Sequence, residues 1–245
     1  MLNFPKALRP ISGGYAPASR TLGGGQSITG FEQAVGSMGG RWQASFTFRV
    51  RTTEQLFALR AFVMAMDGRR NTVALPVFDR ARAPWEVLKG RQQSPAVLRH
   101  RELDGTQYAD PDSFDSGLIV ATAASVAGIA GTIIDVAMEK GGAPQPGQYL
   151  TIASRLYSII GASAQSPYRL TLWPWLRHDL EPGERIEFGA PYAEMRFASD
   201  DQGADALMNL DLLKFATVTL RFEEALPVIG AGHELREDGG YELRE

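Results

Sequence analysis

The fold is decided by residues 41–79, RWQASFTFRVRTTEQLFALRAFVMAMDGRRNTVALPVFD. The first ten of these residues alternate without a break between polar side chains and the apolar set Trp42, Ala44, Phe46, Phe48 and Val50. A period of two with aromatic residues on one face is typical of a half-buried antiparallel strand. We therefore expect a strand over residues 42–50 whose apolar face turns to the core.

After residue 50 the period changes to that of a helix. Thr52 with Gln55 three residues later is a capping box, which predicts a helix that begins at Thr53 and runs to about residue 67. The pair Asp67-Gly68 should end it, because Gly68 can take the left-handed cap. A second strand, interrupted by a proline, is expected over residues 72–78.

The predicted helix is apolar on nearly every side. Between Leu56 and Met66 the single charged residue is Arg60. A surface helix keeps one polar face, so both faces of this helix should be covered. The sheet that contains residues 42–50 can cover one face, and the other requires a second part of the chain or a neighbouring subunit. We therefore place Arg60 and Met64 at a candidate subunit interface.

The composition of the 245 residues is that of an ordinary globular protein, with 44% hydrophobic and 22% charged residues. There is no cysteine, which excludes disulfides, thiolate metal sites and cysteine catalysis. The first six residues lack the charged region and apolar core of a signal peptide, so none is expected. Residues 118–134 carry no charge but are split by glycines, which predicts two buried strands around a turn and no membrane insertion.

The net charge of −3 hides an asymmetry along the chain. Residues 41–101 carry 12 Lys and Arg against 4 Asp and Glu, whereas residues 102–245 carry 10 against 23. Such halves attract each other head to tail between subunits. No recognition motif accompanies the basic half, so we expect no sequence-specific nucleic-acid binding.

The remaining sequence predicts a mainly β protein. Residues 1–40 are punctuated by glycine pairs and triplets and are expected to form turns and an extended arm. Short strands are predicted at residues 132–138, 148–152, 155–160, 168–173 and 185–188, at the spacing of a small barrel or sandwich.

The alternation seen at residues 42–50 returns in residues 192–198 and 212–226. Residues 212–226 should pair with the strands at 42–50 and 72–78. Strands of like pattern so far apart in the sequence indicate that the residues between them are an insertion. We therefore expect a β-sandwich with one flanking α-helix at about 53–67, built from residues 1–88 plus 191–229. Residues 89–190 are expected to form an inserted small β-barrel, and residues 230–245 an acidic C-terminal arm.

The arm contains a small repeat. The sequence of residues 234–237 recurs at residues 242–245, with Asp238-Gly239-Gly240 as a turn between them. A mobile acidic tail is one interpretation, and a two-stranded arm that orders only against a neighbour is the other. The second interpretation adds Glu234, Leu235, Arg236 and Glu237 to the candidate subunit interface.

Catalytic and metal chemistry is not indicated. The three histidines lie in different segments, and neither a Gly-x-Ser-x-Gly nor a His-Glu-x-x-His motif occurs. We therefore expect no enzyme, no catalytic residues and no cofactor. Residues 104–115 form an acidic loop that could hold Ca²⁺, but Asp115 stands where an EF-hand requires glycine, so a solvated turn is preferred.

Trp173 and Trp175 flank a proline and could form a platform on which a sugar stacks. Aromatic faces suit sugar C–H surfaces, but they pack a core or an interface equally well. Packing is the preferred interpretation, because large aromatic side chains are mostly buried. A carbohydrate-binding module for host-surface adsorption therefore stands as the alternative function.

Three stretches taken in order resemble the distal tail proteins of long-tailed bacteriophages and related gene-transfer particles. The first is the aromatic strand of residues 41–50 with its helix (Leu-Arg-Ala-Phe) and the following Leu-Pro-Val-Phe; the others are residues 146–177 and 189–198. The resemblance implies a structural virion protein, a subunit of a hexameric ring where the tail tube meets the tail tip or baseplate hub. The ring domain would be a tail-tube-like β-sandwich, with a barrel of oligonucleotide/oligosaccharide-binding type inserted on the outside.

The resemblance also implies the partners. They would be further copies of the chain, the tail tube protein and the tail hub or tip proteins. The location would be the virion tail, which is assembled in the host cytoplasm.

Overall fold

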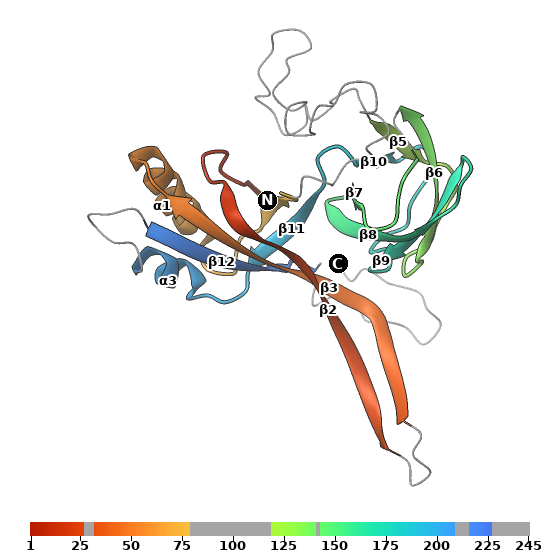
Figure 1. Cartoon of the computed structure of the whole chain (residues 1–245), viewed down its shortest axis with the longest axis horizontal. Helices are drawn as coiled ribbons and strands as arrows, with labels where there is room; N and C mark the ends of the chain where they lie inside the picture. The colour runs from red at the N-terminus through yellow and green to blue at the C-terminus, as the bar shows by residue number, and fades with distance from the viewer. Residues whose placement is uncertain (27–31, 79–118, 141–142, 209–215, 227–245) are drawn as a thin grey trace, which may run out of the picture.

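The computed structural model describes residues 1–26, 32–78, 119–140, 143–208 and 216–226, and the protein is mainly β, as predicted (Figure 1). A first six-stranded sheet has the order β1-β4-β11-β12-β3-β2, and a second has the order β10-β5-β6-β9-β8-β7. The strands of the first sheet are β1 (Leu2–Asn3), β2 (Pro10–Gln26), β3 (Glu32–Val50), β4 (Val73–Pro76), β11 (Tyr192–Phe197) and β12 (Ala216–Glu224). Those of the second are β5 (Val120–Ala123), β6 (Ile133–Lys140), β7 (Tyr149–Ile152), β8 (Arg155–Ala162), β9 (Tyr168–Trp173) and β10 (Arg185–Ile186). The described residues also contain two helices, α1 (Thr53–Met66) and α3 (Gln202–Met208).

The first sheet pairs distant segments as the alternation predicted. β12 runs antiparallel to β3, from Ala216 opposite Val50 to Glu223 opposite Gln43. β11 pairs with both β12 and β4. The apolar side chains of β3 at positions 42, 44, 46, 48 and 50 are all buried. The expected pairing of residues 212–226 with 42–50 is therefore confirmed by β12 and β3. Their expected pairing with 72–78 is wrong, because β11 lies between β12 and β4 in the sheet.

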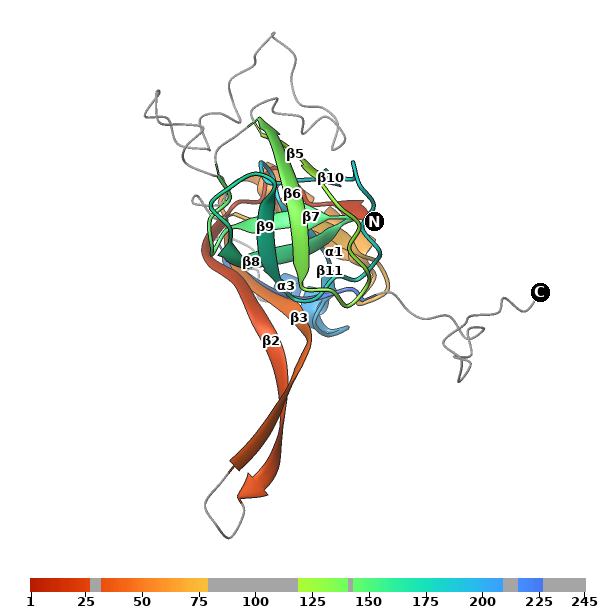
Figure 2. The ribbon, with the colours of Figure 1, turned by 90° about the vertical axis from the view of Figure 1, so that its right-hand side faces the viewer.

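Residues 1–40 differ from the expectation of turns. β3 begins at Glu32, well before the predicted strand, and pairs with β2 as a long hairpin (Figures 1 and 2). The far part of this hairpin extends beyond the other strands of the first sheet. The expectation of an extended arm was right, and the expectation of turns across it was wrong. Glycine lowers strand propensity and leaves no side-chain alternation, although its backbone still forms the ladder.

α1 begins where the capping box predicted. The Thr52 Oγ1 accepts a hydrogen bond from the Gln55 amide at 3.2 Å, and the Gln55 side chain accepts one from the Arg51 amide at 2.8 Å. The helix ends at Met66, and Asp67 is its left-handed C-cap with φ of 48°. Gly68, which was expected in that role, follows with φ of 63°. The buried side chains of α1 are Leu59, Phe62, Val63 and Met66, which join the core of the first sheet.

The second sheet curls into a nearly closed barrel (Figure 2). Its two ends approach each other where Thr151 on β7 and Glu187 after β10 exchange two backbone hydrogen bonds, both of 2.9 Å. The β7–β8 hairpin turns through Ala153 and Ser154, both left-handed, as a two-residue turn of type I′ requires. All of its strands lie between β4 and β11 in the sequence, as an insertion would. The boundaries at residues 89 and 190, and independent folding, stay predictions.

Trp42 of β3 lies at the junction of the two sheets. Its indole Nε1 donates a hydrogen bond to the Leu156 carbonyl of β8 at 2.7 Å. Its ring meets Trp173 edge-on, with 4.7 Å between the ring centroids, and Tyr149 at 5.7 Å. Leu156 is fully buried in the same cluster as the apolar face of β3. The barrel is therefore fixed to the first sheet by buried contacts.

Trp42→Phe is expected to lower the free energy of unfolding by about 1–3 kcal/mol, because the buried Leu156 carbonyl loses its donor and the smaller ring leaves a cavity. Urea unfolding of both chains measures the difference. The control is Trp175→Phe, the same change at a half-buried position outside that cluster. Equal losses for the two variants would contradict the assignment of Trp42 as the junction residue.

Candidate subunit-contact surfaces

The face of α1 that points away from the sheet is apolar and exposed. Phe57 is 60% exposed and Met64 is 72% exposed. Arg60 and Ala61 are also exposed, and the four residues are spaced i, i+3, i+4 and i+7, so they form one stripe along the helix. We call Phe57, Arg60, Ala61 and Met64 the α1 stripe. Grouped exposed apolar side chains of this kind mark interaction sites.

The exposure of the α1 stripe bears on the prediction that both faces of the helix are covered. Both faces were expected to be covered, and among the described residues the chain covers one. Arg60 and Met64, the predicted interface residues of the helix, lie together on the uncovered face. Phe57 was missed, although its spacing to Met64 is visible in the sequence. Glu234, Leu235, Arg236 and Glu237 lie outside the described residues.

The first sheet has two different edges. β1 stands at one end of the strand order and β2 at the other. Within the described part of the chain, each pairs with a single neighbouring strand, β4 for β1 and β3 for β2. Edge strands carry unpaired backbone groups that can pair with another chain. The two edges can therefore serve as unlike contact surfaces.

The face of the first sheet opposite α1 is polar. On β12 the residues that point this way include Thr217, Thr219 and Arg221, all exposed. They lie opposite Arg49, Thr47 and Ser45 of β3, and the hydroxyls of Thr47 and Thr219 are 3.0 Å apart. An antiparallel sheet with one apolar and one polar face turns the polar face to water.

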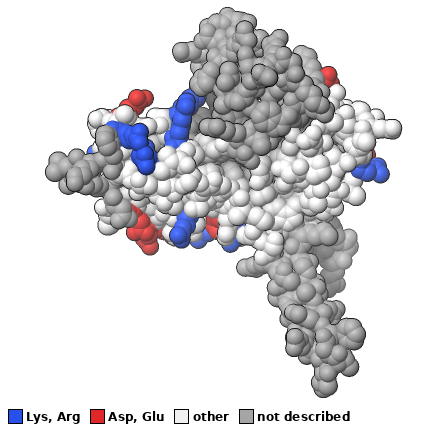
Figure 3. All heavy atoms as spheres, viewed as in Figure 1, with Lys and Arg blue, Asp and Glu red and all other residues white. Residues whose placement is uncertain are grey.

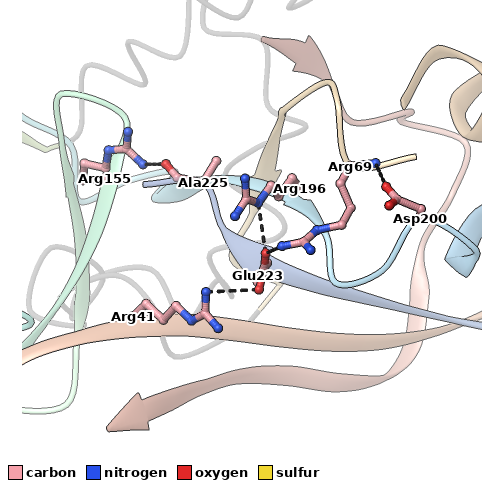
Figure 4. A network of polar contacts seen from close by, with 7 residues as sticks. All are labelled: Arg41, Arg69, Arg155, Arg196, Asp200, Glu223 and Ala225. Atoms are coloured by element: carbon pink, nitrogen blue, oxygen red, sulfur yellow. Dashed lines mark hydrogen bonds and ion pairs between the residues drawn. The ribbon is translucent and has the colours of Figure 1, made fainter. Parts of the chain in front are cut away.

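One end of this polar face is fixed by a charge network around Glu223 (Figure 4). Its carboxylate meets Arg41 of β3 at 3.2 Å and Arg196 of β11 at 3.0 Å, and it also pairs with Arg69 from the loop after α1. The Arg69 amide in turn donates to the Asp200 carboxylate at 3.0 Å. Glu223 is only 7% exposed, so its charge requires these partners. The network ties the end of α1 to three strands.

Glu224 is a buried carboxyl group beneath the junction. One oxygen accepts a hydrogen bond from the Trp42 amide at 3.0 Å, and the other has no hydrogen-bond partner among the described residues. Burial raises the pKa of Glu224, and the opposing effects of the Trp42 amide and the charges of Arg177 and Arg155 are smaller. The ionised form is therefore destabilising in the folded protein.

Trp173 and Trp175 were considered as a sugar platform. Trp173 is half-buried and packs against Trp42 at the junction, so the structure gives its ring a partner within the chain. Trp175 is also half-buried. This placement favours packing, and sugar binding at these two residues stays an untested prediction.

The described residues contain no group of three or more His, Cys, Asp or Glu that could hold a metal ion. The acidic loop at 104–115 lies outside them. Where the structure describes the chain, no helix is long and apolar enough to cross a membrane.

The geometry defines a mainly β protein of two joined sheets with an apolar helix face left open. No protein-family model matches the chain, and no curated protein sequence is significantly similar to it. The function proposed below therefore depends on these surfaces and on the resemblance of the sequence to distal tail proteins.

Two substitutions on opposite sides of α1 should separate folding from contact. Phe62→Asp places an unpaired charge in the core and should cost several kcal/mol, on the order of 3–5 kcal/mol, of unfolding free energy. Met64→Asp lies on the α1 stripe and should change the stability of the isolated chain by about 0.5 kcal/mol or less. Thermal melts at low protein concentration compare the two. If Met64→Asp lowered the free energy of unfolding by more than half as much as Phe62→Asp does, this face would be covered within one chain.

Glu224→Gln should stabilise the protein at pH 7, because it removes a buried charge and keeps an acceptor for the Trp42 amide. The folded-state pKa of Glu224 is raised, so the cost of ionisation is present above that pKa and disappears below the unfolded value of about 4.3. The advantage of the variant should therefore shrink as the pH falls from 7 to 4. Melting curves across this range test it, with the exposed Glu139→Gln as control. A variant less stable than the parent at pH 7 would mean that attraction to the arginines outweighs burial.

Proposed function

We propose that this chain is a structural subunit of a phage tail, a distal tail protein whose copies form a ring between the tail tube and the tail tip or baseplate hub. The observation that carries the proposal is the α1 stripe. A helix with one apolar face in the core and another open to water is expected of a subunit that meets a neighbour. The resemblance of residues 41–78, 146–177 and 189–198 to distal tail proteins supplies the class of assembly.

The two edges of the first sheet favour a ring over a two-fold dimer. A two-fold contact uses the same surface on both subunits, whereas a ring needs two different surfaces that join head to tail. β1 and β2 are unlike in length and in the direction of pairing: β1 is parallel to its neighbour and β2 is antiparallel. Such edges suit contact with each other better than contact with themselves.

The two faces of the sheet suggest an orientation within the ring. If sheets of neighbouring copies lie edge to edge, one face turns to the opening and the other to the outside. We place the polar face with Thr47, Thr219 and Arg221 at the opening, because it is suited to water. α1 then lies toward the outside, where the tail tube and hub proteins and neighbouring copies can reach it.

A carbohydrate-binding module is the second candidate from the sequence. It depends on free aromatic faces at Trp173 and Trp175, and the packing of Trp173 on Trp42 weighs against it. We therefore propose no sugar site, and no catalytic activity.

Light-scattering mass at low salt and high protein concentration tests the proposal. The parent chain should exceed the monomer mass. Met64→Asp should raise the dissociation constant of each contact about tenfold, which corresponds to roughly 1.4 kcal/mol, and so lower the assembled fraction. The control Ile160→Asp changes a side chain of similar exposure, 59%, on β8 and should leave the mass unchanged. Raising the salt should slow assembly more than it dissolves finished rings, because screened charges act mainly on encounter.

The ring proposal would be contradicted if the parent chain remained strictly monomeric under these conditions and added tail tube and hub proteins also failed to recruit it.

A further inference from the structure

The loop between β5 and β6 presents exposed apolar side chains. Val126 is 64% exposed and Ile129 is 62% exposed, and Ile133 at the start of β6 is 52% exposed. Residues 124–132 contain no charged side chain. We call residues 124–133 the β5–β6 loop. Three large apolar side chains are thus exposed within eight residues, whereas exposed apolar residues on an ordinary surface are scattered singly.

Hydrogen bonds to residues 176–180 hold this loop in one shape. Ala127 and Leu180 exchange two backbone bonds of 3.0 and 2.8 Å, and the Ala130 amide donates to the Leu176 carbonyl at 2.9 Å. The Ile129 amide donates to the Asp179 carboxylate at 2.7 Å. A loop fixed in this way loses little conformational entropy when it binds.

The barrel does not need these side chains for its own core. Leu176 and Leu180, to which the loop is bonded, are fully buried in the barrel's cluster, whereas Val126, Ile129 and Ile133 lie outside it. Apolar surface that is rigid, exposed and unused in folding is available to a partner.

We propose that the β5–β6 loop of one copy packs on the α1 stripe of the next copy. This inference rests on the proposed ring and names one of its contacts. The two surfaces are different and lie toward opposite ends of the longest axis of the molecule (Figure 1), the arrangement that a head-to-tail contact requires. Phe57 and Met64 would cover Val126 and Ile129, and both apolar patches would leave water.

Each surface carries a charge that is opposite in sign to one on the other surface. Arg60 is exposed in the middle of the α1 stripe, and Asp179 is exposed beside Ile129. Glu181, which directly follows Leu180, is exposed as well. Asp135, which also lies near the loop, is already paired with Arg169 at 3.0 Å. Arg60 of one copy can therefore meet an acidic rim on the other, which fixes orientation more than affinity.

A lipid surface fits the loop less well than a second copy does. Segments that bind membranes carry Lys or Arg on their polar side and often Trp. The β5–β6 loop contains neither, and carboxylates stand beside it. Figure 3 shows that charged side chains gather over the α1 end in this view, whereas the visible described surface of the barrel end is largely uncharged.

Cysteine cross-linking tests the contact cleanly, because the chain contains no cysteine. Met64→Cys and Ile129→Cys are prepared as single variants of the full chain and mixed under mild oxidation. The mixture should give a disulfide-linked dimer, and each variant alone should stay mostly unlinked. Pairing Met64→Cys with the control Ile160→Cys should cross-link at least about tenfold more slowly, because no docked contact raises the effective concentration there.

A chain that carries both Met64→Cys and Ile129→Cys separates this contact from the ring itself. A ladder of linked species that stops at one closed size supports both proposals, and a ladder that continues without stopping keeps the contact but contradicts the ring. An assembled mass without cross-links above the Ile160→Cys level overturns the contact and leaves the ring standing. Absence of cross-links together with co-sedimentation of the monomer on phosphatidylcholine vesicles would overturn it in favour of a lipid surface.

Discussion

Trp42 holds the two sheets in one arrangement, and the positions of the outer surfaces depend on it. Its indole N–H is satisfied by the Leu156 carbonyl of the barrel, and its ring lies against Trp173 and Tyr149. Its own amide is bonded to the buried Glu224. A side chain with its polar atoms committed and its ring enclosed has little freedom to reorient. The barrel is therefore fixed in position relative to the sheet on which α1 packs.

This rigidity links the fold to the proposed role. A subunit that closes a ring must present its contact surfaces at a fixed angle, since an error repeated at each copy prevents closure. The α1 stripe is fixed by the core residues on the inner side of the helix, and the network around Glu223 anchors the loop that follows it. The β5–β6 loop is fixed by its bonds to residues 176–180. Burial of apolar surface would supply the affinity of such contacts, and the charges would set their orientation.

The sequence predicted the elements in which side-chain periodicity is strong. β3, α1 and β12 were found where alternation or a capping box indicated them, because these signals report which side chains are buried. The barrel strands were found where short strands at barrel spacing and an uncharged run split by glycines indicated them. The part of the β2–β3 hairpin that precedes Arg41 in the sequence was not predicted as strand, since its glycines have no side chains that could show alternation. The short elements β1 and α3 were also missed, because they are held by tertiary contacts. Of the site, Arg60 and Met64 were predicted from the apolar helix, and Phe57 could have been added from its spacing to Met64. The β5–β6 loop required knowledge of exposure.

The central claim is that copies of this chain join head to tail and close. Electron-microscope projection images of the purified protein at low salt, averaged into classes, test it most directly. The account predicts end-on views of closed rings with one rotational symmetry, a central opening, and the barrels on the outer rim. Two-fold dimers or open filaments in place of closed rings would contradict it.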